Sequence, residues 1–90
     1  MYRKIKRTKL FNKDNLKAKL TDQHYSKFII YVGKLIANEE LPPEALDHPL
    51  KGNYQGFREF HISGDKLVIY RVIEDTLYLA RIGTHSQLFE

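Results

Sequence analysis

Three of the four histidines, His48, His61 and His85, lie in the second half of the 90-residue chain, each within a short polar segment. Histidine changes protonation state near neutral pH, so it can give or take a proton without a cofactor. If these three side chains met beside an arginine and an acid, they would suffice for acid–base chemistry. The first question is therefore which elements of structure bring them together.

Length and composition predict one domain spanning residues 1–90. Hydrophobic residues make up 42% of the chain, and it contains no long apolar run, so we expect no membrane association. No apolar segment follows the basic start, which argues against a secretory signal and favours the cytoplasm. The absence of cysteine excludes disulfides, a thiolate nucleophile and thiolate metal sites.

Positive charge is concentrated at the amino end. Residues 1–20 hold eight Lys or Arg and a single acid, Asp14, whereas acidic residues outnumber basic ones in the rest of the chain. A block of this kind attracts polyanions such as a nucleic-acid backbone. A solvated helix face or a surface for an acidic protein partner remains an equally good interpretation.

The first forty residues predict a strand followed by two helices. Residues 2–8 alternate weakly, as in a partly exposed strand. Asn12 is the expected cap of a first helix that ends near Leu20. Thr21 or Asp22 is the expected cap of the second helix. Leu16 and Leu20 are the expected apolar stripe of the first helix, and that of the second is Tyr25, Phe28, Ile29, Val32, Leu35 and Ile36.

Prolines at 42 and 43 end the second helix, and a loop is expected from there to residue 56. Three strands then follow, and they should form an antiparallel meander. The predicted fold is α+β, with a small, mainly antiparallel sheet, the order β-α-α-β-β-β, and both helices on one face of the sheet. The other face is expected to be open. The three final strands are expected at residues 57–62, 67–72 and 76–82.

Alternation along a strand determines which side chains share a face of the sheet. It places His61 with Glu59, and Arg58 on the opposite face, unless a bulge intervenes. It also groups Arg81 with Leu77 and Leu79. Arg81 nevertheless stands at the end of its strand, close to His85, where polar residues commonly assemble sites.

These segments together resemble the YafQ branch of the RelE/ParE toxin superfamily. The resemblance covers residues 41–90 well and the first forty residues in pattern only. It rests on the combination of segments, since none of them is specific alone. They are Asp47-His48-Pro49-Leu50-Lys51-Gly52, Gly56-Phe57-Arg58-Glu59-Phe60-His61, Asp65, Leu67-Val68-Ile69-Tyr70, and Arg81-Ile82-Gly83-Thr84-His85-Ser86-Gln87-Leu88-Phe89.

The resemblance implies a RelE-like fold and a bacterial type II toxin. Such a toxin is a ribosome-dependent endoribonuclease that cuts messenger RNA and is held inactive by a cognate antitoxin. The positions that match functional residues of the family are His48, His61, Asp65, Arg81, His85 and Phe89. One position departs from the pattern, because Lys66 follows the turn acid where the family often has tryptophan.

The chemistry implied is metal-free RNA cleavage with no cofactor, in which the ribose 2′-hydroxyl attacks the neighbouring phosphate. We expect His61 and His85 to share the proton transfers, and His48 and Asp65 to orient the RNA or tune the other imidazoles. Arg81 is the expected stabiliser of phosphate charge. Further contacts to RNA are expected from Lys51, Arg58 and Lys66, and base stacking from Phe89 and Tyr54.

Other functions remain open from the sequence. A non-catalytic toxin of the ParE kind, which acts by binding gyrase, shares the fold but typically lacks the histidines. A hydrolase with zinc held by His48, His61, Asp65 and His85 is a second alternative, although the spacing matches no compact ligand pattern. Each of these residues also has an ordinary structural interpretation, such as a loop cap or a turn residue.

Overall fold

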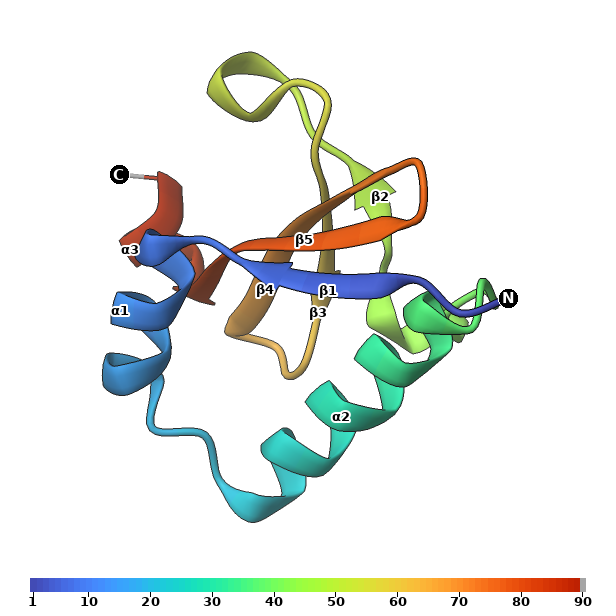
Figure 1. Cartoon of the computed structure of the whole chain (residues 1–90). Coiled ribbons are helices and arrows are strands. Elements are labelled where there is room, and N and C mark those ends of the chain that lie inside the picture. Colours follow the sequence, from blue (N-terminus) through green and yellow to red (C-terminus); the bar gives the residue numbers. More distant parts are fainter. Residues whose placement is uncertain (90) are drawn as a thin grey trace.

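The computed structural model describes residues 1–89, which form a five-stranded sheet with helices. The strand order is β1-β5-β4-β3-β2, so the first strand of the chain lies beside the last (Figure 1). None of the helices in the described part of the chain is long and apolar enough to cross a membrane. The elements are β1 (Lys4–Arg7), α1 (Lys9–Ala18), α2 (Asp22–Ile36), a 3-10 turn (Pro43–Ala45), β2 (His48–Pro49), a second 3-10 turn (Gly52–Tyr54), β3 (Arg58–His61), β4 (Lys66–Ile73), β5 (Thr76–Thr84) and α3 (His85–Phe89).

The predicted meander of the last three long strands is confirmed, since β3, β4 and β5 pair antiparallel in sequence order. The sheet as a whole is mixed, because β1 pairs parallel with β5. A parallel pair needs a long connection, and here it consists of both long helices and the strands β2, β3 and β4. A second difference is the short strand β2, which pairs with β3 in a segment predicted to be a loop. Its proline sits on the edge of the sheet, where a missing N–H costs least.

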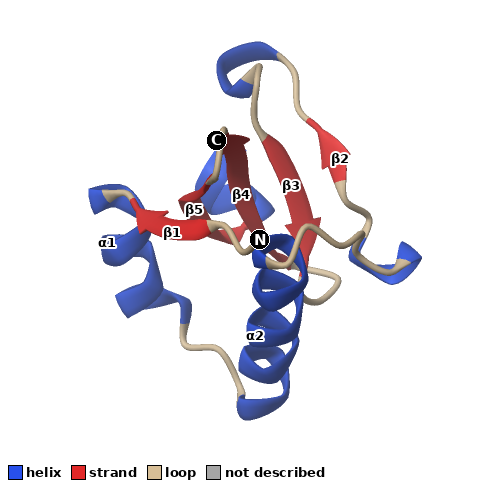
Figure 2. Cartoon of the chain, turned by 45° about the vertical axis from the view of Figure 1, so that its right-hand side comes forward, coloured by secondary structure: helices blue, strands red, loops and turns tan. Residues whose placement is uncertain are grey.

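Threonine side chains begin both long helices. The Thr8 hydroxyl accepts the backbone N–H of Phe11 at 3.0 Å, so Thr8 is the cap of α1. The predicted cap, Asn12, four residues later, was wrong. The Thr21 hydroxyl accepts the N–H of His24 at 3.1 Å, so of the two caps predicted for α2, Thr21 and Asp22, Thr21 is the one confirmed. Figure 2 shows α1 next to the carboxyl end of β1, with an extended loop leading from α1 to α2.

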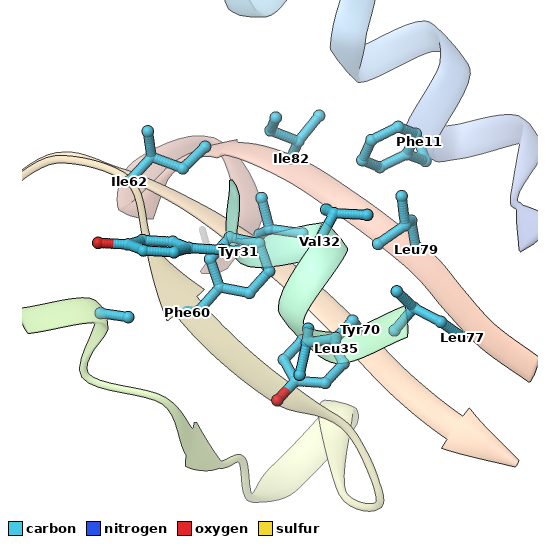
Figure 3. Close-up of a cluster of buried hydrophobic side chains, with 12 residues drawn as sticks. Phe11, Tyr31, Val32, Leu35, Phe60, Ile62, Tyr70, Leu77, Leu79 and Ile82 are labelled. Atoms are coloured by element: carbon cyan, nitrogen blue, oxygen red, sulfur yellow. The ribbon is translucent and has the colours of Figure 1, made fainter. Parts of the chain in front are cut away.

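A hydrophobic cluster joins α1 and α2 to one face of the sheet (Figure 3). The apolar stripe predicted for α1 was wrong at Leu16, whose side chain is 83% exposed. The stripe predicted for α2 was wrong at Tyr25 and Ile29, which are about half exposed. The helices are instead rotated to bury other side chains. The buried members of the cluster are Phe11, Tyr31, Val32, Leu35, Ala45, Phe60, Ile62, Val68, Tyr70, Leu77, Leu79 and Ile82.

The other face of the sheet is partly covered, although it was predicted to be open. A second cluster there contains Leu67, Ile69, Ala80 and Leu88, the last from the unpredicted helix α3. This helix begins with two reciprocal hydrogen bonds. The Thr84 N–H donates to Gln87 Oε1, and the Gln87 N–H donates to the Thr84 hydroxyl. A threonine followed three residues later by glutamine is the sequence signal for such a helix start.

A bulge in β5 alters the alternation on which the face of Arg81 was predicted. Ile69 of β4 pairs with Arg81 and the next residue, Tyr70, pairs with Leu79, so Ala80 is an extra residue. One extra residue moves every later side chain of the strand to the face opposite the one that simple alternation gives it. Alternation predicted that Arg81 lies on the face of Leu77 and Leu79, and this prediction was wrong. Arg81 points with Ala80 toward the face that carries the second cluster.

Candidate functional site

Two of the histidines share one carboxylate on the face of the sheet opposite α2. The register of β2 and β3 places His48 directly across from Glu59, and His61 follows two residues later on the same face. His61 Nε2 lies 2.7 Å from Glu59 Oε2, and His48 Nε2 lies 3.8 Å from the same oxygen. The two imidazole rings are 6.3 Å apart between centroids. We call these three residues the histidine cluster.

Glu59 is a residue to which the sequence assigned no role. Only 4% of its surface is exposed, and it is the one buried charged side chain among the described residues. Strand alternation placed it with His61, so the signal was present. A buried carboxylate is costly without partners, which is consistent with its position between two groups that can carry positive charge.

Hydrogen bonds determine which nitrogen of each ring is free. His48 Nδ1 lies 2.6 Å from the carbonyl oxygen of Leu46, which can only accept. In the neutral ring the proton therefore sits on Nδ1, and Nε2 presents a lone pair. His61 uses Nε2–H to donate to Glu59, which leaves its Nδ1 as the basic nitrogen. Each neutral ring thus keeps one nitrogen able to accept a proton.

A second group of polar and aromatic side chains gathers where β5 meets α3. Arg81 Nη1 donates to the Tyr54 hydroxyl at 3.3 Å. The Tyr54 ring packs edge-on against Phe89 with centroids 5.4 Å apart, and the His85 ring lies 4.6 Å from that of Phe89. The hydrogen bond with Asp14 raises the pKa of Arg81 further above its ordinary range, so this side chain is always cationic. We call Arg81, Tyr54, His85 and Phe89 the arginine group.

The histidine cluster and the arginine group lie on opposite sides of β4. Glu59 pairs with Ile69, which pairs in turn with Arg81, so two strand spacings, or about 10 Å, separate the Glu59 and Arg81 backbones. The buried side chains of Leu67 and Ile69 form the floor between them. Arg81 on one side is held by Asp14 and Tyr54, and Glu59 on the other side is held between His48 and His61. One small, charged group could therefore contact both sets.

A pocket borders the arginine group. It has a volume of about 470 Å³ and is lined by Lys51, Asn53, Tyr54, Leu88 and Phe89. The aromatic rings of Tyr54 and Phe89 provide flat faces, and Lys51 is an exposed cation. A splayed nucleobase with its phosphate needs surfaces of these kinds. Three residues predicted to contact RNA therefore lie together here.

The chain as a whole matches one known protein family. The family described as "Bacterial toxin of type II toxin-antitoxin system, YafQ" matches residues 3–90. The chain belongs to the YafQ family. This confirms the resemblance found in the sequence and extends it to the amino-terminal half, where only the pattern agreed.

Individual relatives agree with the family. The mRNA interferase toxin YafQ of Escherichia coli B/BL21-DE3 is 35% identical over 81 residues, covering 88% of this chain and 87% of the relative. The E. coli DinJ-YafQ toxin-antitoxin complex superimposes with a TM-score of 0.84 at 32% identity, over the whole of both chains. A metal-bound toxin from Helicobacter pylori gives a TM-score of 0.83 at 37% identity, with 97% and 99% coverage.

Arg58 does not lie with the YafQ-like histidines. Its Nε donates to Asp47 Oδ1 at 3.1 Å, and the Tyr70 hydroxyl donates to the same oxygen at 2.6 Å. Tyr70 belongs to the cluster on the opposite face of the sheet. Strand alternation predicted this separation of Arg58 from His61 correctly. The structure therefore does not bring Arg58 together with the histidines, and its contact with RNA stays a prediction.

Lys66 also lies away from the site, because its ammonium donates to the carbonyl of Ala18 at the end of α1. The position where the family often has tryptophan thus serves here to join the β3–β4 turn to α1. Asp65 is exposed in the same turn, four residues after His61. Its backbone N–H donates weakly to the Ser63 hydroxyl at 3.4 Å.

The zinc alternative needs His48, His61, Asp65 and His85 to converge on one point. Within residues 1–89, no three His, Cys, Asp or Glu side chains are grouped so that they could hold a metal ion. His85 instead lies against Phe89, on the far side of β4 from the other two histidines. The donor set that this alternative requires is therefore not assembled.

Proposed function

We propose that this YafQ-family toxin is an mRNA interferase that cuts messenger RNA on the ribosome by metal-free acid–base catalysis. The observation that carries the proposal is the placement of the histidine cluster and the arginine group on opposite sides of β4, with about 10 Å between the Glu59 and Arg81 backbones and apolar side chains of β4 between them. A phosphodiester bound between them would meet proton acceptors on one side and a fixed cation on the other.

The comparisons support this proposal through the relatives. The E. coli relative is named an mRNA interferase, and another structure shows a YafQ toxin in complex with the antitoxin DinJ. We infer that this toxin too has a cognate antitoxin and acts in the cytoplasm. The basic residues 1–20 would add salt-sensitive attraction to ribosomal RNA.

The reaction itself requires two proton transfers. The ribose 2′-oxygen forms a bond to phosphorus as the bond from phosphorus to the 5′-oxygen breaks. One group takes the 2′-hydroxyl proton, and another gives a proton to the departing 5′-oxygen, leaving a 2′,3′-cyclic phosphate and a 5′-hydroxyl. We assign the two transfers to His61 and His85, because these histidines lie on opposite sides of β4.

The remaining side chains have supporting roles. Glu59 holds the His61 ring and stabilises its charged form after it accepts a proton. His48 faces the same carboxylate and orients RNA beside it, with Asp65 at the nearby turn. Arg81 stabilises the charge that develops on the phosphate oxygens. Tyr54 and Phe89 stack bases next to the scissile bond, and Lys51 contacts the backbone.

The test is cleavage of a defined messenger in a cell-free translation extract, mapped by primer extension. We expect the wild type to cut ribosome-bound messenger, and His61→Ala or His85→Ala to lower the cleavage rate by about a hundredfold or more. His24→Ala, on the first turn of α2, is the matched control and should cut normally.

Three outcomes would contradict parts of the proposal. An intact messenger with the wild type would remove the nuclease function and favour a gyrase-binding toxin. Equal cutting by all variants would remove the histidine assignment. Loss of cutting in a chelator, restored by a transition metal but not by Mg²⁺ at ribosome-supporting levels, would show that the chemistry needs a metal.

A further inference from the structure

The side chain of Asp14, the only acid among the first twenty residues, holds Arg81 from helix α1. Its Oδ2 accepts Arg81 Nε–H at 2.6 Å and its Oδ1 accepts Nη2–H at 3.0 Å. Oδ2 also accepts the backbone N–H of Ile82 at 3.2 Å. One carboxylate thus fixes both the guanidinium and the strand that bears it, across 67 residues of sequence.

The geometry leaves Arg81 with unused donors. A guanidinium has five N–H groups, of which two go to Asp14 and one to Tyr54. The two that remain are enough for a paired contact to a phosphate. The Arg81 side chain is 21% exposed, so it is held in place and still reachable. Two fixed partners also reduce the rotamer freedom that a long side chain would lose on binding RNA.

A small pocket lies at this junction. Its volume is about 240 Å³, and it is lined by Asp14 and Lys17 of α1, Arg81 and Ile82 of β5, and Gln87 of α3. Gln87 is the side chain that caps the start of α3, the helix that carries His85 and Phe89. The carboxylate of Asp14 therefore sits where α1, the end of β5 and α3 come together.

We propose that Asp14 is a positioning residue for RNA cleavage, which acts by aiming the free donors of Arg81 at the scissile phosphate. This inference rests on the proposed function, in which Arg81 stabilises phosphate charge. The carboxylate does not touch RNA, and its negative charge opposes the attraction of phosphate to Arg81. Asp14 therefore contributes to the rate of the bound complex and not to RNA affinity.

Because Asp14 orients Arg81 but repels phosphate, its loss should affect kcat and KM differently. Asp14→Asn keeps the size of the side chain but removes its charge and one of its two acceptor oxygens. We expect kcat for cleavage of ribosome-bound messenger to fall about tenfold to a hundredfold, the effect of misplacing a reacting group by about 1 Å. KM should stay unchanged or fall. If Asp14 served folding alone, Asp14→Asn would lower the fraction of folded, active toxin. The thermal midpoint of unfolding, measured by circular dichroism, would then fall together with the cleavage rate.

A double-mutant cycle with Arg81→Gln tests whether Asp14 acts through Arg81. If it does, Asp14→Asn should add less than about a twofold loss once Arg81 is replaced, because the group it positions is gone. Independent, multiplicative losses would overturn the proposal. Asn15→Ala, an exposed neighbour on α1, is the matched control and should keep both kcat and KM.

The outcomes separate this inference from the proposed function. If Arg81→Gln cuts as well as the wild type, the role of Arg81 fails and the inference fails with it. If Arg81→Gln loses cleavage while Asp14→Asn retains full kcat, only the positioning role is overturned. A loss in both single variants that does not multiply in the double variant supports both.

Discussion

At the scale of single residues, the carboxylate of Glu59 is the group that organises the two histidines nearest to it. It is almost fully buried, and a charge in that position is retained only when it is paired. His61 supplies the close partner at 2.7 Å, while His48 stands farther away at 3.8 Å. The difference in distance indicates that Glu59 primarily orients His61, and that His48 is freer to meet a substrate.

Replacing Glu59 with glutamine isolates its charge from its hydrogen bond. A glutamine oxygen can still accept His61 Nε2–H, so the ring orientation is kept, but the charged imidazole loses its counter-ion. We expect the cleavage rate to fall about tenfold to a hundredfold. The measurement is single-turnover cleavage of ribosome-bound messenger.

The matched control for this variant is Glu74→Gln, at an exposed turn remote from β3. It should cleave at the wild-type rate. Wild-type cleavage by Glu59→Gln would show that the carboxylate has no electrostatic part in the reaction.

At the scale of elements, short segments are held on the sheet by specific side chains. The loop that presents His48 is fixed through Asp47, which accepts from both Tyr70 of β4 and Arg58 of β3. The helix that presents His85 is fixed by the paired bonds of Thr84 and Gln87. His48 and His85 are thus each presented by a segment that polar contacts of neighbouring residues hold in place.

The Tyr70 contact predicts how stability depends on alkaline pH. Burial, followed by the hydrogen bond to Asp47, raises the pKa of Tyr70 above its ordinary value near 10. Because the folded state holds this proton more tightly, its stabilising effect is complete below pH 10 and is lost as pH rises toward the folded pKa. We expect the free energy of unfolding to fall by up to about 1.4 kcal/mol per pH unit in that window from this group.

Tyr70→Phe removes the titrating group and so provides the comparison. The slope above pH 10 in urea unfolding experiments should be smaller in this variant than in the wild type. At pH 7 the variant should also lose about 0.5–1.5 kcal/mol, the usual net value of a hydrogen bond. Identical alkaline slopes in the two proteins would contradict the assignment.

Gly83→Ala tests the junction of β5 and α3. A methyl group at this position would lie 2.7 Å from Gln87 Oε1, the atom that accepts the Thr84 N–H. Gln87 must move, so the helix start loses one of its two capping bonds at a cost of about 1 kcal/mol. We expect cleavage to fall several-fold, since His85 and Phe89 lie on this helix. Gly64→Ala has open space around it and should cleave normally, and equal cleavage by both variants would count against this role of the junction.

At the scale of the whole molecule, the two faces of the sheet have different tasks. One face carries the cluster formed with α1 and α2, which includes the largest buried side chains. The other face carries a smaller apolar floor, flanked by the groups that the proposed reaction uses. The stability of the fold therefore depends on one face, and substitutions there should act on folding before they act on chemistry.

Phe60→Ala measures that dependence. Phe60 is completely buried. Its ring centroid lies 5.7 Å from that of Tyr31 and 5.7 Å from that of Tyr70. Removing the ring leaves a cavity and should lower the free energy of unfolding by about 3–5 kcal/mol. Leu16→Ala removes a side chain that is 83% exposed and should change it by less than about 0.5 kcal/mol. Urea unfolding compares the two, and a similar loss in both would refute the placement of this core.

The sequence by itself determined the order of the longer elements and the family, but not the short strand β2 or the helix α3. Proline and glycine punctuation located the loops, the threonine cap located the start of α2, and alternation placed His61 with Glu59 and away from Arg58. These are short-range properties, set by backbone geometry and by the period of a strand or helix. Apolar spacing alone gave the wrong stripe for α1, because the side of a helix that is buried depends on what it packs against.

Only the tertiary structure decided how the site is assembled. The parallel pairing of β1 with β5, the bulge at Ala80 and the contact between Asp14 and Arg81 all join residues far apart in the chain. No local pattern encodes such contacts, since each depends on the register of several strands at once. The three histidines consequently separate into a pair that shares Glu59 and a single residue across β4, and that division follows from the sheet alone.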